Sequence, residues 1–249
     1  MSFPLFRAAI LLLVPALAVA EPPVKEQTGR HYSFRKEHDP DGTGKFYMGR
    51  EIAQVMSFHG APWLNRPERE EEERLSKLIE LLDLQDGQIA ADIGAGSGVL
   101  TEQLARAVGE TGKVYAVDIQ DEMLALIRGR MKDAGIKNVV PILGSITSPK
   151  LESDSVDLML LVDVYHEFSH PYEMTKTMSD ALKPGGRIVL VEYRKEDPRV
   201  PIKEVHKMSE AQVKKELLPP EFDLEWVETH DELPRQHVVV FRKKALEPE

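Results

Sequence analysis

Residues 91–101 read ADIGAGSGVLT and form the most informative segment of the chain. The pattern predicts a strand that ends at Asp92, a glycine-rich turn and then a helix. Gly94 and Gly96 can adopt positive φ and let a ligand approach the backbone closely. The helix start presents free N–H groups to a polar or anionic group. A tight turn without a ligand is the alternative, but three alternating glycines are costly in conformational entropy, so the pattern favours a ligand-binding loop.

The spacing of this loop is D-x-G-x-G-x-G, whereas a dinucleotide-binding loop follows G-x-G-x-x-G and would need glycine where Val99 stands. A second apolar run, VYAVD, ends at Asp118. A carboxylate at the end of the second strand can accept hydrogen bonds from both ribose hydroxyls. The two signals together indicate a nucleoside with an adjacent polar or charged arm, bound at the carboxyl ends of the strands.

Around this loop, short apolar runs alternate with helical patterns. The predicted strands are 89–92, 113–118, 139–143, 156–162, 187–192, 224–229 and 237–242, and the predicted helices among them are 100–107, 121–134 and 172–182. This alternation is typical of a parallel sheet with helices on both faces. The last two strands are joined by a short link without a helix and should form an antiparallel hairpin. We expect a doubly wound α/β fold with a mostly parallel, seven-stranded sheet.

The N-terminal segment has the pattern of an export signal. In residues 1–20 Arg7 is the only charge, an apolar run follows it, and Ala18-Val19-Ala20 gives a cleavage pattern. An uncleaved N-terminal anchor is the alternative. The chain has no cysteine and a net charge of −10, so it can form no disulfide and we expect no nucleic-acid partner. These features predict a periplasmic or secreted protein without stable membrane insertion; they leave its oligomeric state open.

Residues 21–66 are expected to form an exposed arm and a lid, and residues 67–249 the main domain. Within the arm, DPDGTGK (39–45) resembles the start of a calcium loop, but Arg50 occupies the position that requires glutamate, so a turn is the better interpretation. Tyr47, Met48, Phe58 and Trp63 could line a lid. Asn65 to Glu68 has the pattern of a helix start, and the leucines that follow predict one amphipathic helix.

Together these features resemble the class I S-adenosylmethionine-dependent methyltransferases over residues 75–242. The resemblance rests on the glycine loop, the strand ends at Asp118 and Asp163, and the LKPGGR turn at 182–187. It implies S-adenosylmethionine as the cofactor, with Asp163 and Ile119 also close to it and Asp118 on the ribose. It places the methionine end at Asp92, Gly94, Ala95, Gly96 and Gly98. Many members carry an acid after the third strand for the adenine amino group; here LGSI (143–146) offers only Ser145 or the backbone.

The segment HEFSH (166–170) also satisfies the zinc-protease pattern H-E-x-x-H, which requires a helix that turns both histidines one way. Here it follows a predicted buried strand, and Pro171 biases His170 away from helical angles. The positions that would extend the pattern are Glu173 and Lys176. We therefore expect no metal site, with a zinc peptidase kept as an alternative.

The resemblance places the loop after the fourth strand beside the transferred methyl group. His166 is then the candidate base, Glu167 would orient it or bind a cationic acceptor, and Asp163 completes the predicted catalytic set. A purely structural histidine is the alternative. Tyr165, Glu192 and Tyr193 are predicted substrate contacts. The chain is thus expected to transfer a methyl group to a small-molecule acceptor; the alternative is a cofactor-binding protein with lost or altered chemistry.

Overall fold

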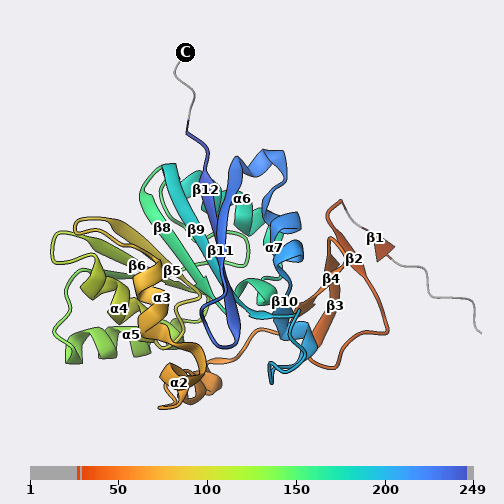
Figure 1. Cartoon of the computed structure of the whole chain (residues 1–249), viewed down its shortest axis with the longest axis horizontal. Helices are drawn as coiled ribbons and strands as arrows, with labels where there is room; N and C mark the ends of the chain where they lie inside the picture. The colour runs from red at the N-terminus through yellow and green to blue at the C-terminus, as the bar shows by residue number, and fades with distance from the viewer. Residues whose placement is uncertain (1–26, 29, 246–249) are drawn as a thin grey trace, which may run out of the picture.

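A computed structural model describes residues 27–28 and 30–245 (Figure 1). Its main sheet has the strand order β11-β12-β9-β8-β5-β6-β7, with β10 paired to the far end of β9. The strand β12 runs antiparallel to both of its neighbours, β9 and β11, and the other described strand pairs of this sheet are parallel. The strands are β5 (Ile89–Ile93), β6 (Lys113–Asp118), β7 (Val139–Leu143), β8 (Val156–Val162), β9 (Leu182–Arg194), β10 (Lys207–Met208), β11 (Leu224–His230) and β12 (Gln236–Lys243). The predicted fold class is confirmed; β10 is an addition.

Helices cover both faces of this sheet (Figure 1). The helices α3 (Leu75–Leu81), α4 (Val99–Ala107) and α5 (Asp121–Asp133) pack on one face. The helices α6 (Pro171–Ala181) and α7 (Glu210–Leu217) pack on the other. Successive strand residues point to opposite faces of the sheet. Leu160 belongs to the core under α3 and α4, Leu161 belongs to the core under α6 and α7, and both are fully buried. Burial on both faces explains why the central strands are apolar runs without alternation.

The LKPGGR segment lies inside β9 instead of before it. Val156 of β8 pairs with Leu182, and Leu158 then pairs with Arg187, so the residues between them bulge out of the ladder. Gly185 has φ +78°, which a bulge of this kind requires of one residue. Because the ladder continues beyond this bulge, β9 begins at Leu182, earlier than the predicted strand 187–192.

The predicted single helix after Asn65 is two helices. Asn65 follows α1 (Ala61–Leu64), and α2 (Arg69–Glu73) is separated from α3 by Arg74 at φ +52°. The break turns Glu73 into the protein, where its carboxylate is fully buried, pairs with Arg66 and Arg69, and accepts a hydrogen bond from the Tyr193 hydroxyl at 3.0 Å. These buried polar contacts override the local helical pattern.

Within residues 21–66, where an arm and a lid are expected, the described residues form a small antiparallel sheet followed by short helices. The strands of this sheet, in spatial order, are β1 (Gln27–Thr28), β2 (Tyr32–Phe34), β3 (Gly42–Tyr47) and β4 (Arg50–Ala53). The turn expected at 39–42 is present: the Asp39 carboxylate accepts the Asp41 N–H and its carbonyl accepts the Gly42 N–H. The sheet lies beside α7 at the end of the main sheet where β9 finishes (Figure 1).

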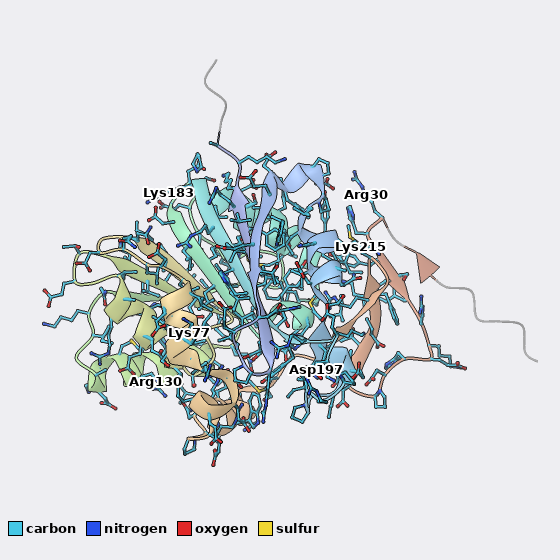
Figure 2. All side chains as sticks on the ribbon, viewed as in Figure 1. Arg30, Lys77, Arg130, Lys183, Asp197 and Lys215 are labelled. Atoms are coloured by element: carbon cyan, nitrogen blue, oxygen red, sulfur yellow. The ribbon has the colours of Figure 1, made fainter. Side chains whose placement is uncertain are left out.

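Figure 2 shows the two ends of the main sheet through Lys183, near the start of β9, and Asp197, just beyond its end. The small sheet and α2 lie near the Asp197 end (Figures 1 and 2). The predicted signal peptide lies outside the described residues. None of the described helices combines the length and the apolar character needed to cross a membrane.

Candidate active site

A cavity of about 470 Å³ opens at the carboxyl ends of β5, β6 and β8. Its wall combines the glycine loop, the end of β6, the loop after β8 and the segment between β4 and α2. The lining residues on which the site depends are Gly94, Gly96, Asp118, Ile119, Ser145, Asp163, His166, Glu167, Tyr193 and His206. Most of the predicted site residues therefore meet in one cavity, although they come from separate parts of the chain.

The glycine loop has the backbone that its sequence predicts. Gly94, Gly96 and Gly98 have φ of +73°, +54° and +79°. A Cβ at Gly94 would lie 2.4 Å from a methyl carbon of Val164, and a Cβ at Gly96 would lie 2.7 Å from one of Leu64. Gly98 precedes α4, and neither it nor Ala95 is part of the cavity wall. Gly94 and Gly96 therefore form the part of the loop that faces the cavity, and Gly98 is the residue at which the loop joins α4.

Asp92 lies behind the loop and not on the cavity wall. Its side chain is buried, and its Oδ2 accepts a hydrogen bond from the Thr101 hydroxyl at 2.6 Å. Burial raises the pKa of Asp92 to about 6, although the Thr101 hydrogen bond acts in the opposite direction. Asp92 thus ties the end of β5 to α4 instead of offering its carboxylate directly to the cavity.

Asp118 faces the cavity with its carboxylate already oriented. Its Oδ2 accepts the Gly96 N–H and its Oδ1 accepts the Gln120 N–H, both at 2.9 Å. Each oxygen keeps a further lone pair for a hydroxyl donor. Ile119 and Ile146, which are 40% and 51% exposed, add apolar surface beside it. A ribose on Asp118 and a base against these isoleucines fit this arrangement.

The position after β7 offers no carboxylate to the cavity. Ser145 is on the wall, and its hydroxyl donates to the Ser148 carbonyl at 3.2 Å. Its oxygen accepts the Thr147 N–H at 3.4 Å and keeps one further lone pair for an amino group. The residues of the cavity therefore fit an adenosine-like group through Asp118, the isoleucines and Ser145, with a weaker polar contact to the base than a carboxylate would give.

Asp163 is strained and incompletely satisfied. It has φ +52°, its Oδ2 accepts from Gln236 Nε2 at 2.7 Å, and its buried Oδ1 has no hydrogen-bond partner. Burial, reinforced by the negative charges of Glu73 and Glu192, raises its pKa well above the usual value. Strain and an unpartnered buried oxygen are concentrated at functional sites, and this residue lies on the cavity wall.

His166 is oriented by Glu192 and not by Glu167. The His166 Nδ1 lies 2.6 Å from Glu192 Oε2, and both side chains are buried. Glu192 Oε1 accepts the Tyr165 N–H at 3.0 Å. An ionised carboxylate only accepts hydrogen bonds, so Nδ1 carries the proton and Nε2 is directed elsewhere. The pairing joins the loop after β8 to β9, a contact 26 residues apart that no local pattern reveals.

Two of the predicted substrate contacts lie behind the cavity wall. Tyr165 and Glu192 are fully buried and do not line the cavity, so neither presents a side chain to a ligand there. The Tyr165 ring lies under the Arg50 guanidinium, 5.7 Å from it. Tyr193 does line the cavity, and its hydroxyl is bound to Glu73. Glu192, a predicted substrate contact, thus contacts His166 and does not line the cavity.

Glu167 and His206 complete the polar wall. Glu167 Oε2 accepts the Met56 N–H at 3.2 Å, and burial raises the pKa of this carboxyl. His206 Nδ1 lies 3.1 Å from His166 Nε2. The sequence predicts no catalytic or binding role for His206. Its place beside His166 results from the pairing of β10 with β9, which the sequence does not signal.

The two histidines of the H-E-x-x-H pattern do not converge. His166 and Glu167 lie in a single turn of 3-10 helix, η2 (Tyr165–Glu167), whereas His170 precedes α6. The His170 ring contacts Ser169 and the Tyr32 ring and is not on the cavity wall. The helix that a zinc protease needs is therefore absent from this segment of the described chain.

The segment between β4 and α2 lies over the site. Gln120 holds it by accepting the Phe58 N–H at 2.8 Å and donating to the Met56 carbonyl at 2.9 Å. Its apolar residues on the cavity wall are Val55, Met56, Trp63 and Leu64. At the far end of this segment, Asn65 Oδ1 accepts hydrogen bonds from the Ser97 hydroxyl and from Arg130. Arg130 belongs to α5 and is labelled in Figure 2. Of the aromatic residues expected in a lid, Trp63 is on the wall and Tyr47 is buried in the small sheet.

The strand order, the antiparallel terminal hairpin and the glycine loop beside Asp118 define a Rossmann-like fold, a class in which ligands bind at the carboxyl ends of the strands. A model of the methyltransferase-domain family matches residues 84–236. The chain belongs to this family, the class I S-adenosylmethionine-dependent methyltransferases.

Curated relatives match part of the chain. A ubiquinone/menaquinone biosynthesis C-methyltransferase, UbiE, from Ectopseudomonas mendocina (strain ymp) is 32% identical over 118 residues, which are 47% of this chain and 46% of that protein. The corresponding protein of Pseudomonas putida (strain GB-1) is 31% identical over the same length. This chain thus spans about half the length of these relatives.

Solved structures share the fold. A SAM dependent methyltransferase from Aquifex aeolicus has a TM-score of 0.71 at 23% identity and covers 76% of this chain and 100% of its own. The [4+2]-cyclase SpnF has a TM-score of 0.60 at 14% identity and covers 70% and 81%. Proteins with different reactions therefore share this architecture, and the reaction must be argued from the site.

Proposed function

We propose that the protein binds S-adenosylmethionine and transfers its methyl group to a small, largely apolar acceptor. The observation that supports this most strongly is that a single cavity is lined by the glycine loop, by Asp118 and by the imidazole of His166. The cofactor would supply a sulfonium-bound methyl group for in-line displacement, a reaction that depends mainly on alignment. Gly94, Gly96, Asp118 and Ile119 would hold the nucleoside and its arm.

The acceptor side of the cavity is argued from its lining. Apolar side chains dominate the wall outside the nucleoside region: Met56, Trp63, Leu64, Phe168, Met174 and Ile202. An apolar or aromatic molecule would bury its surface there with a favourable free energy. The UbiE relatives are C-methyltransferases of ubiquinone and menaquinone biosynthesis, so a hydroxylated aromatic ring is the first acceptor class to test.

His166 is placed to accept a proton from such an acceptor. Because Glu192 holds Nδ1–H, Nε2 carries a lone pair, which faces His206 Nδ1 at 3.1 Å and would be the acceptor of a hydroxyl or ammonium proton. The buried carboxylate would stabilise the imidazolium that forms. Removing this proton would leave a nucleophilic oxygen, nitrogen or activated ring carbon. We propose His166 as the base and Glu192 as the residue that orients it.

The cofactor assignment can be tested by calorimetry with S-adenosylhomocysteine. Asp118→Ala should weaken binding by roughly 100-fold, because it removes hydrogen bonds to a charged acceptor, each worth about 1.5–3 kcal/mol. Asp121→Ala is the matched control, since Asp121 is exposed in the first turn of α5 and does not line the cavity. Equal binding by wild type and Asp118→Ala would refute the assignment.

The methyl-transfer step needs its own measurement. Incubation with methyl-labelled S-adenosylmethionine and a panel of hydroxylated aromatic acceptors should give a labelled product by mass spectrometry. Tight S-adenosylhomocysteine binding without transfer to any acceptor class would favour the alternative, a cofactor-binding protein with altered chemistry, as the cyclase SpnF illustrates for this fold.

A further inference from the structure

We propose that His166, Glu167 and His206 form a binding site for a divalent transition-metal ion on the wall of the cavity. Among the described residues, this is the only group of three histidine or carboxylate side chains whose ligand atoms all lie within 4.8 Å of one another. All three residues line the cavity, so an ion between them would face the acceptor region. The site goes beyond the proposed methyl transfer and rests on these side chains alone.

The two imidazoles have the spacing of metal ligands. His166 Nε2 and His206 Nδ1 are 3.1 Å apart. Metal–nitrogen bonds of about 2.0–2.1 Å place two such nitrogens roughly 2.9 Å apart at octahedral angles and roughly 3.3 Å apart at tetrahedral angles. The rings are nearly perpendicular, with an interplanar angle of 82°. A direct hydrogen bond between the rings has the same distance, and the experiment below separates the two.

The buried carboxylate of Glu192 fixes the first ligand. It holds His166 Nδ1 at 2.6 Å, which leaves the Nε2 lone pair directed toward His206. A carboxylate behind a histidine is the usual outer-shell partner of a metal ligand, because it sets the tautomer and raises the basicity of the ring. The Arg50 guanidinium also donates to the His166 carbonyl at 3.0 Å and holds the backbone of this ligand.

Glu167 supplies the third ligand after a small movement. Its Oε1 lies 4.0 Å from His206 Nδ1, and its Oε2 is held by the Met56 N–H. The carboxylate must approach the imidazoles by roughly 1 Å to reach a metal–oxygen distance of about 2.0–2.2 Å. Three protein ligands leave at least one coordination position open to the cavity, the arrangement typical of catalytic sites.

The ligand set selects the class of ion. Two imidazoles and one carboxylate suit zinc, iron, cobalt or manganese, whereas calcium and magnesium prefer all-oxygen surroundings. An ion here would use the first two residues of the H-E-x-x-H pattern but replace His170 by His206. It would also occupy the Nε2 lone pair of His166, so the ion, in place of the imidazole, would acidify an acceptor hydroxyl and release its proton to water.

The test uses the full chain, stripped of metal and titrated with Zn²⁺ by calorimetry and with Co²⁺ by visible absorption. Wild type should bind one ion per chain. His206→Ala and Glu167→Gln should weaken binding at least 10-fold, and Glu192→Gln should weaken it by roughly 10- to 100-fold as an outer-shell change. His170→Ala is the matched control and should bind like wild type. Circular dichroism verifies that each variant is folded.

Three results would overturn the proposal: no stoichiometric Zn²⁺ or Co²⁺ binding by wild type, equal binding by His206→Ala and wild type, or a loss of binding in His170→Ala that is absent in His206→Ala. The first result would leave a hydrogen bond between His166 and His206. S-adenosylhomocysteine binding is measured separately on metal-free protein, so failure of the metal site and failure of the cofactor assignment are distinguishable.

Discussion

Asp92 illustrates how a site residue can act through the fold and not through direct contact. Its carboxyl is buried between the end of β5 and α4 and accepts a hydrogen bond from the Thr101 hydroxyl. Burial raises its pKa to about 6. Folding therefore favours the protonated carboxyl of Asp92 relative to the unfolded chain, so ionisation of this group destabilises the folded protein as the pH rises toward 6.

We predict that Asp92→Asn stabilises the ligand-free protein at neutral pH. With a pKa of 3.8 unfolded and about 6 folded, wild type keeps the full contribution of the neutral carboxyl below pH 3.8 and loses it as the pH rises through 6. The free energy of unfolding of the variant relative to wild type should increase over this window by on the order of 3 kcal/mol, since each pH unit is worth about 1.4 kcal/mol.

Urea denaturation at several values between pH 4 and pH 8 measures this difference. Asp121→Asn, at an exposed aspartate of α5, is the control and should differ from wild type by the same small amount at every pH. A difference between Asp92→Asn and wild type that does not change with pH would contradict the prediction.

At the scale of elements, the site is built from the junctions that follow parallel strands. The β5–α4 junction carries the glycine loop, the end of β6 carries Asp118, and the loop after β8 carries Asp163 and η2. Gly94 is packed against Val164 of the last of these loops. A change in one junction therefore displaces its neighbour.

We predict that Gly94→Ala is more damaging than Gly135→Ala. Both glycines have positive φ, +73° and +68°, so alanine costs about 1–2 kcal/mol at either position. A Cβ at Gly94 would also lie 2.4 Å from Val164, whereas no atom lies within 4 Å of one at Gly135. The overlap should add roughly 1–3 kcal/mol of destabilisation.

Thermal or urea unfolding of both variants measures the stability difference, and calorimetry with S-adenosylhomocysteine measures its effect on the site. Gly94→Ala should weaken binding, and Gly135→Ala should not, because Gly135 lies at the end of α5 away from the cavity wall. Equal effects of the two substitutions on both measurements would show that only backbone conformation matters.

At the scale of the whole molecule, the small N-terminal sheet is attached through a buried ion pair. Arg50 of β4 donates to both carboxylate oxygens of Glu216 in α7, at 2.8 and 2.9 Å. Both side chains are almost completely buried. The same guanidinium reaches the His166 carbonyl, so docking of the small sheet also supports the loop that carries the candidate base.

We predict that Arg50→Met lowers the free energy of unfolding by about 3–5 kcal/mol, because Glu216 would keep a buried charge without a counter-charge. The double variant Arg50→Met with Glu216→Leu should recover most of this loss, since no charge is then buried alone. Lys176→Met is the control; its exposed ion pair with Asp180 should contribute less than about 1 kcal/mol. A double variant no more stable than Arg50→Met would contradict the prediction.

The strands, the glycine loop and Asp118 could be predicted from the sequence because their signals are local. Apolar runs, glycine spacing and a carboxylate at a strand end depend on residues within a few positions of one another. Asp92, Ala95 and Gly98, which are predicted cofactor contacts, belong to this segment but do not line the cavity, whereas Gly94 and Gly96 do. The small sheet was missed because its strands are short and its anchoring contacts join residues more than 100 positions apart.

The doubly wound α/β fold, its terminal hairpin and the glycine loop beside Asp118 can be predicted from the sequence alone, because backbone conformation and burial periodicity are local properties. Which residues surround His166 depends on tertiary contacts. Glu192 lies on β9 and His206 directly precedes β10, and their contacts with His166 depend on strand pairing across the sheet. Since such pairing leaves no periodic trace in the sequence, the choice between a structural histidine, a base and a metal ligand depends on the folded chain.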